Sequence, residues 1–507
     1  MAWRDALRPR LTLKYIFWAT LASYFAICIL SDMPFFSSKL PAYTGPYKVG
    51  TIDIEAPVER QRTSDAVFKH DGGPAFEMET VLFSLYYPAN KDVRTRKPYH
   101  YWIPKPVSLH AEGYARFAHI NNFFTNKLFA LALWTLAGST TIPAEVDVPL
   151  NGTIKGYRNY DKEHPIDDYG LPRHPVIVFS HGQASGRTSY TQFCAELASR
   201  GYVVAAIEHR DGSGPGSVIM GKDGMKHKRF HINADMLDPK PETADFKVMQ
   251  LAFRQAEIEQ TVRILRQIND GVGSDLYRAN PRQEGEDLAE WQGRLMVESM
   301  VISGHSYGAT GALQALKGGP TYERPFVGAV IMDPGKQSGP LNDDIHIPLI
   351  ILHSNSWSKA HSIFHGRPHF DVVKDLAVKN LDVHHKFTWF MTSIGTTHPS
   401  VTDAPLIEPL LLSWTTGATI DVRQGVYQYV KATDNFMHYL STEQRKGVLK
   451  EEVTHPSYDE DIRDERRKLE MDQEVAKYWQ IHVAPSTACA APGLCGVWPD
   501  RAGRPGS

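Results

Sequence analysis

Ser306 stands at the centre of the pentapeptide GHSYG, in which Gly304 and Gly308 flank the serine two positions away on either side. An apolar run, residues 299–303, precedes the pentapeptide, and small residues, 309–312, follow it. This pattern is typical of a nucleophile elbow, where a buried strand ends in a sharp turn that exposes a serine hydroxyl before a helix begins. Glycines are needed there because no β-carbon fits where the helix and the strand approach each other. The pattern predicts a serine nucleophile for acyl transfer.

An acid and a base follow Ser306 in the order that such a site requires, serine, then aspartate or glutamate, then histidine. Asp333 ends an apolar run and leads into a turn at Pro334, and His398 lies on a polar loop after another apolar run. His398 would accept the Ser306 proton, while Asp333 would fix the tautomer of the imidazole and stabilise the imidazolium. The sequence therefore predicts a catalytic triad of Ser306, Asp333 and His398.

This part of the chain also offers other acids and bases, namely Asp343, Asp344, His353, His384 and His385. Many proteins with such an elbow carry the acid after the next strand, but residues 353–357 contain no carboxylate, which favours Asp333. His353 ends a strand and fits a structural role. His384 and His385 come before the last strand, at the wrong edge of the sheet, which favours His398.

The oxyanion of an acyl-transfer intermediate needs two backbone donors, one of which is the residue after the nucleophile, here Tyr307. The second donor is expected in the glycine-containing loop 180–186, and we assign it to Gln183. We interpret His181 in the same loop as a structural hydrogen-bonding residue, and the polar loop 208–214 as structural as well. No histidine and cysteine spacing suits zinc and no phosphate-binding glycine motif opens a helix, so the sequence predicts cofactor-free and metal-free chemistry.

Eight strand-like runs could position these residues, with helix-like stretches between the later ones. The runs are residues 49–54, 79–87, 175–180, 202–208, 300–304, 326–332, 347–353 and 386–392. The helical stretches are residues 189–200, 251–268, 306–316 and 421–440. Alternating strands and helices predict a mostly parallel α/β sheet covered on both faces, entered by two antiparallel strands. A serine after the fifth strand is the arrangement of the α/β-hydrolase fold, for which we expect eight strands.

Composition limits the class of protein. With 507 residues, of which 42% are hydrophobic, the chain can bury a large core. Lysine and arginine number 55 against 57 acidic residues, so no basic field exists to hold nucleic acid. Of the four cysteines, only Cys489 and Cys495 are spaced for a small bridged loop, which excludes a disulfide scaffold.

The N-terminal residues Leu11 to Leu30 form an apolar stretch long enough to span a bilayer as a helix, with one charge, Lys14, near its start. Further basic residues precede it, Arg4, Arg8 and Arg10, which predicts a cytoplasmic N-terminus and a lumenal or extracellular catalytic part. We expect an uncleaved signal anchor, and a cleaved signal peptide followed by secretion is the alternative. Asn151 begins a glycosylation sequon that this topology would expose to modification.

Three segments together give the chain a resemblance to a known family: VFSHG at 178–182, LASRGYVVAAIEHRD at 197–211 and the elbow itself. Shorter segments, LYYPA at 85–89, WIP at 102–104 and TTIPA at 140–144, support it. They are similar to the plasma-type (lipoprotein-associated phospholipase A2-like) and intracellular type II platelet-activating factor acetylhydrolases over about residues 50–412. The resemblance implies a calcium-independent esterase that removes a short or oxidised acyl group from the sn-2 position of a phospholipid. By position, it implies the same triad and the same oxyanion residues.

The chain departs from the family pattern at two places near the expected site. Gln183 stands where the family has a leucine-like residue, and Pro334 and Gly335 follow Asp333 where the family has a bulkier sequence that contains an aromatic residue. These departures affect the expected acyl pocket, whereas the N-terminal anchor and about the last 90 residues lie outside the resemblance.

The sequence divides into an N-terminal stub, anchor and linker at 1–48, a catalytic domain at 49–440 with an insert at about 95–165, and a charged tail at 441–507 that is partly disordered. Within the insert, residues Tyr114 to Ala137 are rich in aromatic and apolar residues. They are interpreted equally well as a lid or an interfacial helix on a lipid surface, or as a helix packed on the core.

Two other functions remain open at this point. The first is an esterase or lipase that acts on other small or polymeric esters. The second is a hydrolase-fold binding module without activity, which the complete set of Ser306, Asp333 and His398 disfavours. The oligomeric state is not predicted.

Overall fold

The computed structural model describes residues 12–30, 37–153, 171–221, 224–359, 363–364, 366–409, 415–460 and 471–486. At its centre lies a ten-stranded sheet with the strand order β16-β15-β12-β11-β10-β5-β6-β3-β1-β4. In chain order the strands are β1 (Lys48–Arg62), β3 (Glu77–Ala89), β4 (Glu145–Val146), β5 (His174–Ser180), β6 (Val203–Ile207), β10 (Leu295–His305), β11 (Phe326–Met332), β12 (Leu349–Ser354), β15 (Thr388–Ser393) and β16 (Trp479–Val483).

Six adjacent strands, β15, β12, β11, β10, β5 and β6, are parallel to one another. Strand β3 joins them antiparallel to β6 and pairs antiparallel with β1, which is the antiparallel entry that the sequence predicts. In a parallel sheet the carboxyl ends of the strands meet at one edge, so the loops after β10, β11 and β15 come together. With the elbow serine after β10, this is the α/β-hydrolase fold.

All eight predicted strands are present, but the predicted count of eight is wrong because the sheet has ten. Strand β4 is only two residues long, which is too short to give a sequence pattern. Strand β16 pairs antiparallel with β15 and forms one edge of the sheet. It lies within residues 441–507, for which the sequence predicts a charged, partly disordered tail, so that prediction is wrong for the part of the segment that belongs to the sheet.

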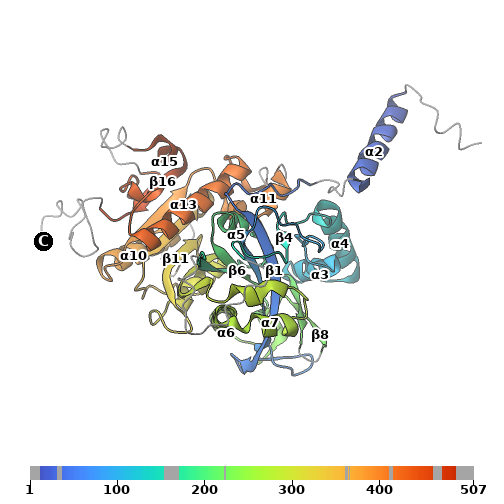
Figure 1. Ribbon diagram of the computed structural model, residues 1–507, viewed down its shortest axis with the longest axis horizontal. Helices are drawn as coiled ribbons and strands as arrows, with labels where there is room; N and C mark the ends of the chain where they lie inside the picture. The colour runs from blue at the N-terminus through green and yellow to red at the C-terminus, as the bar shows by residue number, and fades with distance from the viewer. Residues whose placement is uncertain are drawn as a thin grey trace, which may run out of the picture.

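Helices cover both faces of the sheet, as expected (Figure 1). Neighbouring residues of β10 show the two faces, because Ile302 packs in one buried cluster and Val301 in the other. The first cluster includes residues of α6 (Thr243–Gln267), α8 (Tyr307–Ala315) and α10 (His369–Asp382). The second includes residues of α5 (Thr191–Ala198) and α13 (Val422–Thr442). Four of these helices, α5, α6, α8 and α13, correspond to the predicted helical stretches.

The insert between β3 and β5 contains two helices, α3 (Val107–Phe117) and α4 (Phe123–Ala137). The side chain and backbone of Asn122 cap the start of α4, so the predicted stretch 114–137 is broken at that point. Only Ala137 of α4 is buried. Five of its large apolar side chains are exposed, with Phe123 at 70%, Phe124 at 81%, Leu128 at 65%, Leu131 at 59% and Trp134 at 51%. Helix α4 is therefore not a core helix.

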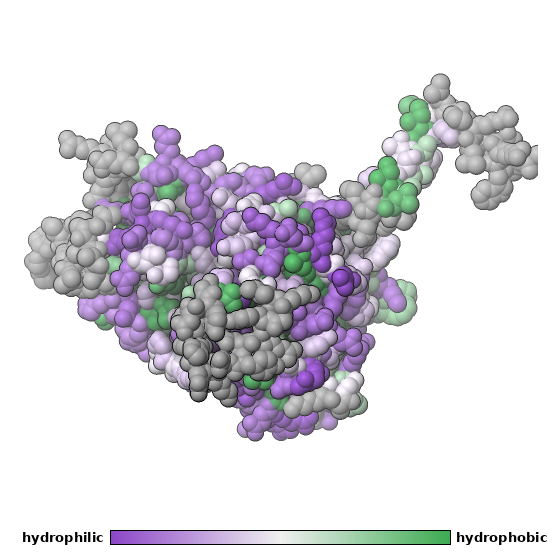
Figure 2. Space-filling model, viewed as in Figure 1, coloured by the Kyte–Doolittle hydropathy of each residue, from purple (hydrophilic) through white to green (hydrophobic). Residues whose placement is uncertain are grey.

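Helix α2 (Leu13–Leu30) contains most of the predicted anchor. Its hydrophobic residues are visible at the upper right of Figure 2. Among the residues that the structure describes, no helix combines the length and the apolar character needed to cross a membrane. The basic residues at positions 4, 8 and 10, and the cysteine pair Cys489 and Cys495, lie outside the described residues.

Candidate active site

The turn at Ser306 has the strained backbone of a nucleophile elbow. Ser306 follows β10, precedes α8, and adopts φ 56° and ψ −122°. A β-carbon at Gly304 would lie 2.3 Å from the carbonyl oxygen of Gly308, and one at Gly308 would lie 2.1 Å from that of Ser180. Real β-carbons do not approach backbone atoms so closely, so only glycine lets α8 pack this tightly on β10 and β5. The predicted reason for the two glycines is confirmed.

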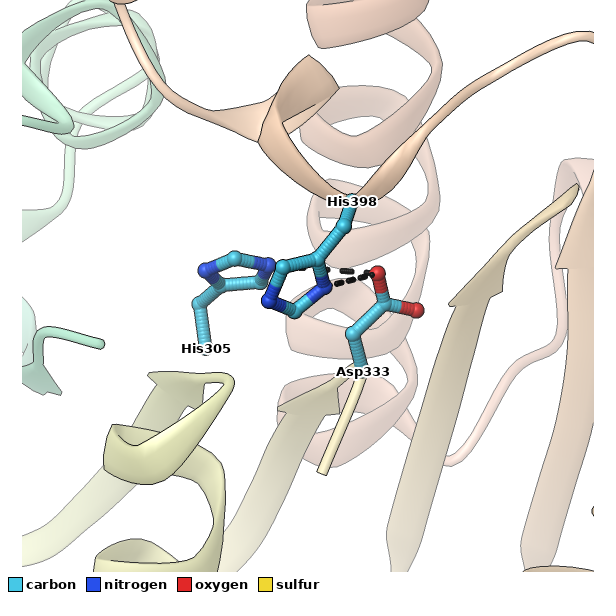
Figure 3. A group of neighbouring side chains, drawn as sticks. All are labelled: His305, Asp333 and His398. Atoms are coloured by element: carbon cyan, nitrogen blue, oxygen red, sulfur yellow. Dashed lines mark hydrogen bonds and ion pairs between the residues drawn. The ribbon is translucent and has the colours of Figure 1, made fainter. Parts of the chain in front are cut away.

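The structure brings Ser306, His398 and Asp333 together in one hydrogen-bonded chain. The Nε2 atom of His398 lies 3.0 Å from the Ser306 hydroxyl, and its Nδ1 atom lies 2.8 Å from Oδ2 of Asp333. Figure 3 shows the imidazole of His398 reaching down from its loop toward Asp333 at the end of a strand. The His398 side chain is 29% exposed, so solvent and substrate can reach the base. A serine, a histidine and an aspartate in this geometry can perform nucleophilic acyl transfer.

Asp333 is 1% exposed and adopts a positive φ of 45°, which aims its carboxylate into the site. Besides His398, the backbone N–H and the hydroxyl of Ser354 each donate to it at 2.6 Å. Burial alone would raise the pKa of Asp333, but hydrogen bonding by His305 and His398 and the charge of His398 hold it well below its usual range. The carboxylate therefore stays ionised and can stabilise an imidazolium.

A second imidazole, His305, lies beside His398 with ring centroids 4.5 Å apart. The hydroxyl of Tyr190 accepts from the N–H of Gly182 at 3.1 Å and donates to Nδ1 of His305 at 2.8 Å. This places the His305 proton on Nε2, which lies 3.9 Å from Asp333. Burial, with the neighbouring His398, lowers the pKa of His305 to about 4, so it remains neutral and does not compete as the base.

The two expected oxyanion residues flank the nucleophile. Tyr307 is the first residue of α8, where backbone N–H groups have no partner within the helix. A β-carbon at Gly182, next to Gln183, would lie 3.1 Å from that of Ser306, so the loop runs directly against the nucleophile. Within the part of the chain that the structure describes, neither Tyr307 nor Gln183 uses its backbone N–H in a hydrogen bond. Both groups can therefore receive a developing oxyanion.

Buried polar residues fix the loop that carries Gln183. His181 donates from Nδ1 to the Gly182 carbonyl at 2.7 Å and accepts at Nε2 from the backbone N–H of His209 at 3.0 Å. Arg254 donates to the His181 carbonyl at 2.7 Å and to Asp211 at 2.8 Å. Its guanidinium also lies 4.5 Å from the centre of the Tyr307 ring. The segments with the sequences SHG and EHRD are thus structural, as expected, and they hold both sides of the oxyanion site.

His209 and Glu257 form a buried pair beneath this loop, 2.7 Å apart. Burial raises the pKa of Glu257 and lowers that of His209, so the pair is uncharged. A protonated Glu257 then donates to Nδ1 of His209, whose Nε2–H donates to the hydroxyl of Ser180 at 2.7 Å. A neutral chain of hydrogen bonds reaches the loop from α6 without placing a free charge in the core.

The other predicted candidates lie away from Ser306 or are engaged elsewhere. Asp343 pairs with Lys379 at 3.0 Å, and Asp344 pairs with His346 at 2.9 Å. His353 is fully buried and shares a hydrogen bond with Ser358. His384 packs against His346 with ring centroids 4.4 Å apart. His385 lies before the first residue of β15, whereas Ser306 lies after the last residue of β10, so the two residues are at opposite ends of the parallel strands. The geometry favours Asp333 and His398 over each of these alternatives.

Two groups of possible metal ligands occur among the described residues, each with ligand atoms within 4.8 Å of one another. The first is His305, Asp333 and His398, and the second is the more exposed set of Asp344, His346 and His384. In the first group both nitrogens of His398 are already bonded to Asp333 and Ser306. This group is therefore better described as a proton relay than as a metal centre.

Sequence reasoning missed Trp357, which stacks on His398 with ring centroids 3.9 Å apart and an angle of 11° between the planes. Trp357 belongs to α9 (Asn355–Lys359), the short helix directly after β12. An aromatic residue directly after a strand is a weak signal, because it does not indicate which residue its ring packs against. Tyr190, Ser354 and Arg254 were missed as well, because nothing in their local sequence marks them.

Most of the chain matches a family of known proteins. Residues 34–451 match the sequence model of a protein family, which is described as platelet-activating factor acetylhydrolase, isoform II. A platelet-activating factor acetylhydrolase of Cavia porcellus is 25% identical over 373 residues, which cover 70% of each chain. A candidate phospholipase A2 of Schizosaccharomyces pombe is 29% identical over 300 residues, which cover 54% of this chain and 58% of that protein.

Among solved structures, a ferulic acid esterase from Streptomyces cinnamoneus matches with a TM-score of 0.48 and 17% sequence identity. The match covers 80% of this chain and 93% of that one.

The elbow packing can be tested by comparing Gly308→Ala with Gly311→Ala in the same helix. A β-carbon at Gly311 would meet nothing closer than 3.5 Å, whereas one at Gly308 would clash with backbone. We expect Gly308→Ala to destabilise the fold by about 1–3 kcal/mol, as overpacking does, and Gly311→Ala to have little effect or to stabilise by roughly 0.5–1 kcal/mol. Urea unfolding of both variants measures the difference, and equal stabilities would contradict the tight packing of α8 on Ser180.

Proposed function

The chain belongs to the platelet-activating factor acetylhydrolase isoform II family, and on that premise we propose that it is a calcium-independent serine esterase that hydrolyses phospholipids. The bond cleaved is the sn-2 ester, and the acyl group is acetyl or a short or oxidised chain. The observation that carries the proposal is the hydrogen-bonded chain from Ser306 through His398 to the buried Asp333, within the part of the sequence that the family covers.

In the proposed reaction the Ser306 hydroxyl attacks the sn-2 carbonyl carbon while Nε2 of His398 takes its proton. The N–H groups of Tyr307 and Gln183 receive the oxyanion, and Asp333 stabilises the imidazolium. The intermediate collapses when His398 returns the proton to the leaving oxygen, which releases a lysophospholipid and leaves an acyl-enzyme. Water, deprotonated by His398, then cleaves the acyl-enzyme and restores Ser306.

Removing the nucleophile or the base gives the direct test. We expect Ser306→Ala and His398→Ala each to lower kcat by about 1000-fold or more. A fluorophosphonate probe should label the wild type and fail to label Ser306→Ala. Absence of labelling in folded wild-type protein would favour the binding module instead, and full turnover by His398→Ala would show that the base was misassigned.

The substrate class is tested with phospholipids that share a head group and differ only at sn-2, from acetyl through truncated oxidised to long chains, with calcium chelated. We expect hydrolysis to continue without calcium and to fall as the sn-2 chain lengthens. Plain water-soluble esters serve as the comparison. A strong preference for them over every phospholipid would favour the alternative, a carboxylesterase or lipase on other esters.

Phospholipid substrates lie in membranes or lipid particles, and α4 offers an apolar face that suits such a surface. Phe124, Leu128 and Leu131 project from it with more than half of their surface exposed. Burying one such side chain in lipid is favourable by roughly 1.5–3 kcal/mol, so a few of them suffice for reversible binding. Lys127 beside them supplies a positive charge that anionic lipid would attract.

We expect the double change Phe124→Glu and Leu128→Glu to weaken binding to phosphatidylcholine vesicles by about 10-fold or more. Turnover of a water-soluble acetyl ester should stay unchanged, because α4 contributes no residue to the triad. Tyr322→Glu with Val383→Glu is the matched control, since both residues are apolar and exposed elsewhere on the molecule. Equal loss of vesicle binding in both double variants would contradict a specific role for α4.

The N-terminal segment Leu11 to Leu30 is proposed as an uncleaved anchor that leaves the catalytic domain on the lumenal or extracellular side. The charge pattern of the sequence supports this proposal. Asn151, which is half-buried and held through its backbone by the Pro88 carbonyl, would carry a glycan only on that side.

We expect the full chain to remain in the membrane fraction after carbonate extraction, and a variant without residues 1–36 to be released. A glycosidase-sensitive mass shift that Asn151→Gln abolishes would confirm the orientation. A processed N-terminus beginning after the apolar stretch would instead support secretion after signal cleavage.

A further inference from the structure

The imidazole of His398 is enclosed on both faces. Trp357 lies on one side, nearly parallel, with ring centroids 3.9 Å apart, and His305 lies on the other at 4.5 Å with an angle of 36°. The two nitrogens at the edge of the ring form the hydrogen bonds to Asp333 and Ser306. The base can therefore neither tilt nor turn without displacing one of the two neighbouring rings.

Trp357 is itself held at three points. Its indole N–H donates to the Pro334 carbonyl at 3.0 Å, and its own carbonyl accepts from the Lys336 ammonium at 3.0 Å. The same ammonium lies 4.3 Å from the centre of the indole ring, within the range of a cation–π interaction. Because Pro334 and Gly335 present no large side chain, the indole can reach the backbone directly after the acid.

The rest of α9 binds the loop of the base as well. The hydroxyl of Ser356 accepts from the backbone N–H of His398 at 3.0 Å, and the Ser356 N–H donates to the Thr396 carbonyl at 3.2 Å. Helix α9 thus holds the backbone of His398 through one residue and its ring through the next.

We propose that Trp357 is the positioning residue of the base, and that Lys336 both holds the indole in place and sets a positive charge behind it. The inference rests on the proposed function, in which His398 takes and returns a proton twice in each cycle. Between these transfers the ring must keep its orientation while substrate, leaving group and water replace one another. The flat face of Trp357 restricts that rotation and also stabilises the imidazolium when it forms.

The charge environment of His398 is set by groups from four elements. Asp333 faces it from the end of β11 and His305 from β10, while His369 of α10 contacts the indole at 6.1 Å between ring centroids. Lys336 lies on the loop after β11. Among the described residues no carboxylate lies within ion-pair distance of its ammonium, and burial lowers the pKa of Lys336. Its ammonium lies against the indole ring that stacks on His398.

The first experiment compares Trp357→Ala and Trp357→Phe on a water-soluble acetyl ester, with active sites counted by fluorophosphonate titration. We expect Trp357→Ala to lower kcat by about 100-fold, as a small misplacement of a catalytic group does, with KM and the melting temperature nearly unchanged. The labelling rate of Ser306 should fall in parallel, and Trp357→Phe should recover most of the activity because it restores a flat ring.

Tyr322→Ala removes an exposed aromatic ring far from the site and is the control. If Trp357→Ala keeps the wild-type kcat while His398→Ala is inactive, the positioning role is overturned and the proposed function stands. If a lower melting temperature accounts for the whole loss, with full kcat per titrated site, the role is likewise overturned. An inactive wild type, or an active His398→Ala, would instead overturn the proposed function itself.

The second experiment replaces the charge with Lys336→Met and follows kcat/KM for the same neutral ester against pH. The change removes a positive charge that lies against the indole stacked on His398, so we expect the acid limb of the profile to move up by about half a pH unit. Lys379→Met removes a remote lysine that pairs with Asp343 and should leave the profile unchanged. An unshifted profile overturns the role of Lys336. A higher KM confined to phosphate-bearing substrates would also overturn it, because Lys336 would then contact the substrate.

Discussion

A single buried charge organises the catalytic edge of the molecule. The Asp333 carboxylate is almost completely removed from water, and an ion in such a place is tolerated only when donors surround it. Its donors come from the ends of other strands: Ser354 from β12 and His398 from the loop after β15. Satisfying the charge therefore fixes the relative positions of three loops, and the orientation of the base toward Ser306 follows from that requirement.

The other half of the site depends on a second set of buried polar groups. Arg254 of α6 reaches both the His181 carbonyl and the ring of Tyr307, so one guanidinium supports the two segments that supply the oxyanion donors. The neighbouring pair of His209 and Glu257 is neutral and adds hydrogen bonds without a further charge. The segments SHG and EHRD thus support the site, while the residues proposed to react, Ser306, Asp333 and His398, come from short and common motifs.

The grouping of Ser306, Asp333 and His398 and most of the sheet could be predicted because each rests on a local pattern: apolar runs, glycines around Ser306, and the chain order of three residue types. Trp357 could not be predicted, because its stacking on His398 joins residues 41 positions apart and has no periodic signal. Strand β16 could not be predicted because a highly charged stretch precedes it, and its five residues are too few to stand out from that composition. The exposure of α4 also lay beyond the sequence, since a continuous apolar helix is equally consistent with a buried position.

The position of β16 has a consequence for how this protein is made. Some neighbouring strands of the sheet are far apart in the sequence. Strand β5 ends at Ser180, but its partner β10 begins only at Leu295, and the partner of β15 is Trp479–Val483. A chain growing from the ribosome therefore carries β15 with an unpaired edge until Trp479–Val483 have been made. Nascent chains of this protein should depend on chaperones that shield strand edges, and truncation shortly before residue 479 should produce aggregation rather than a smaller soluble enzyme.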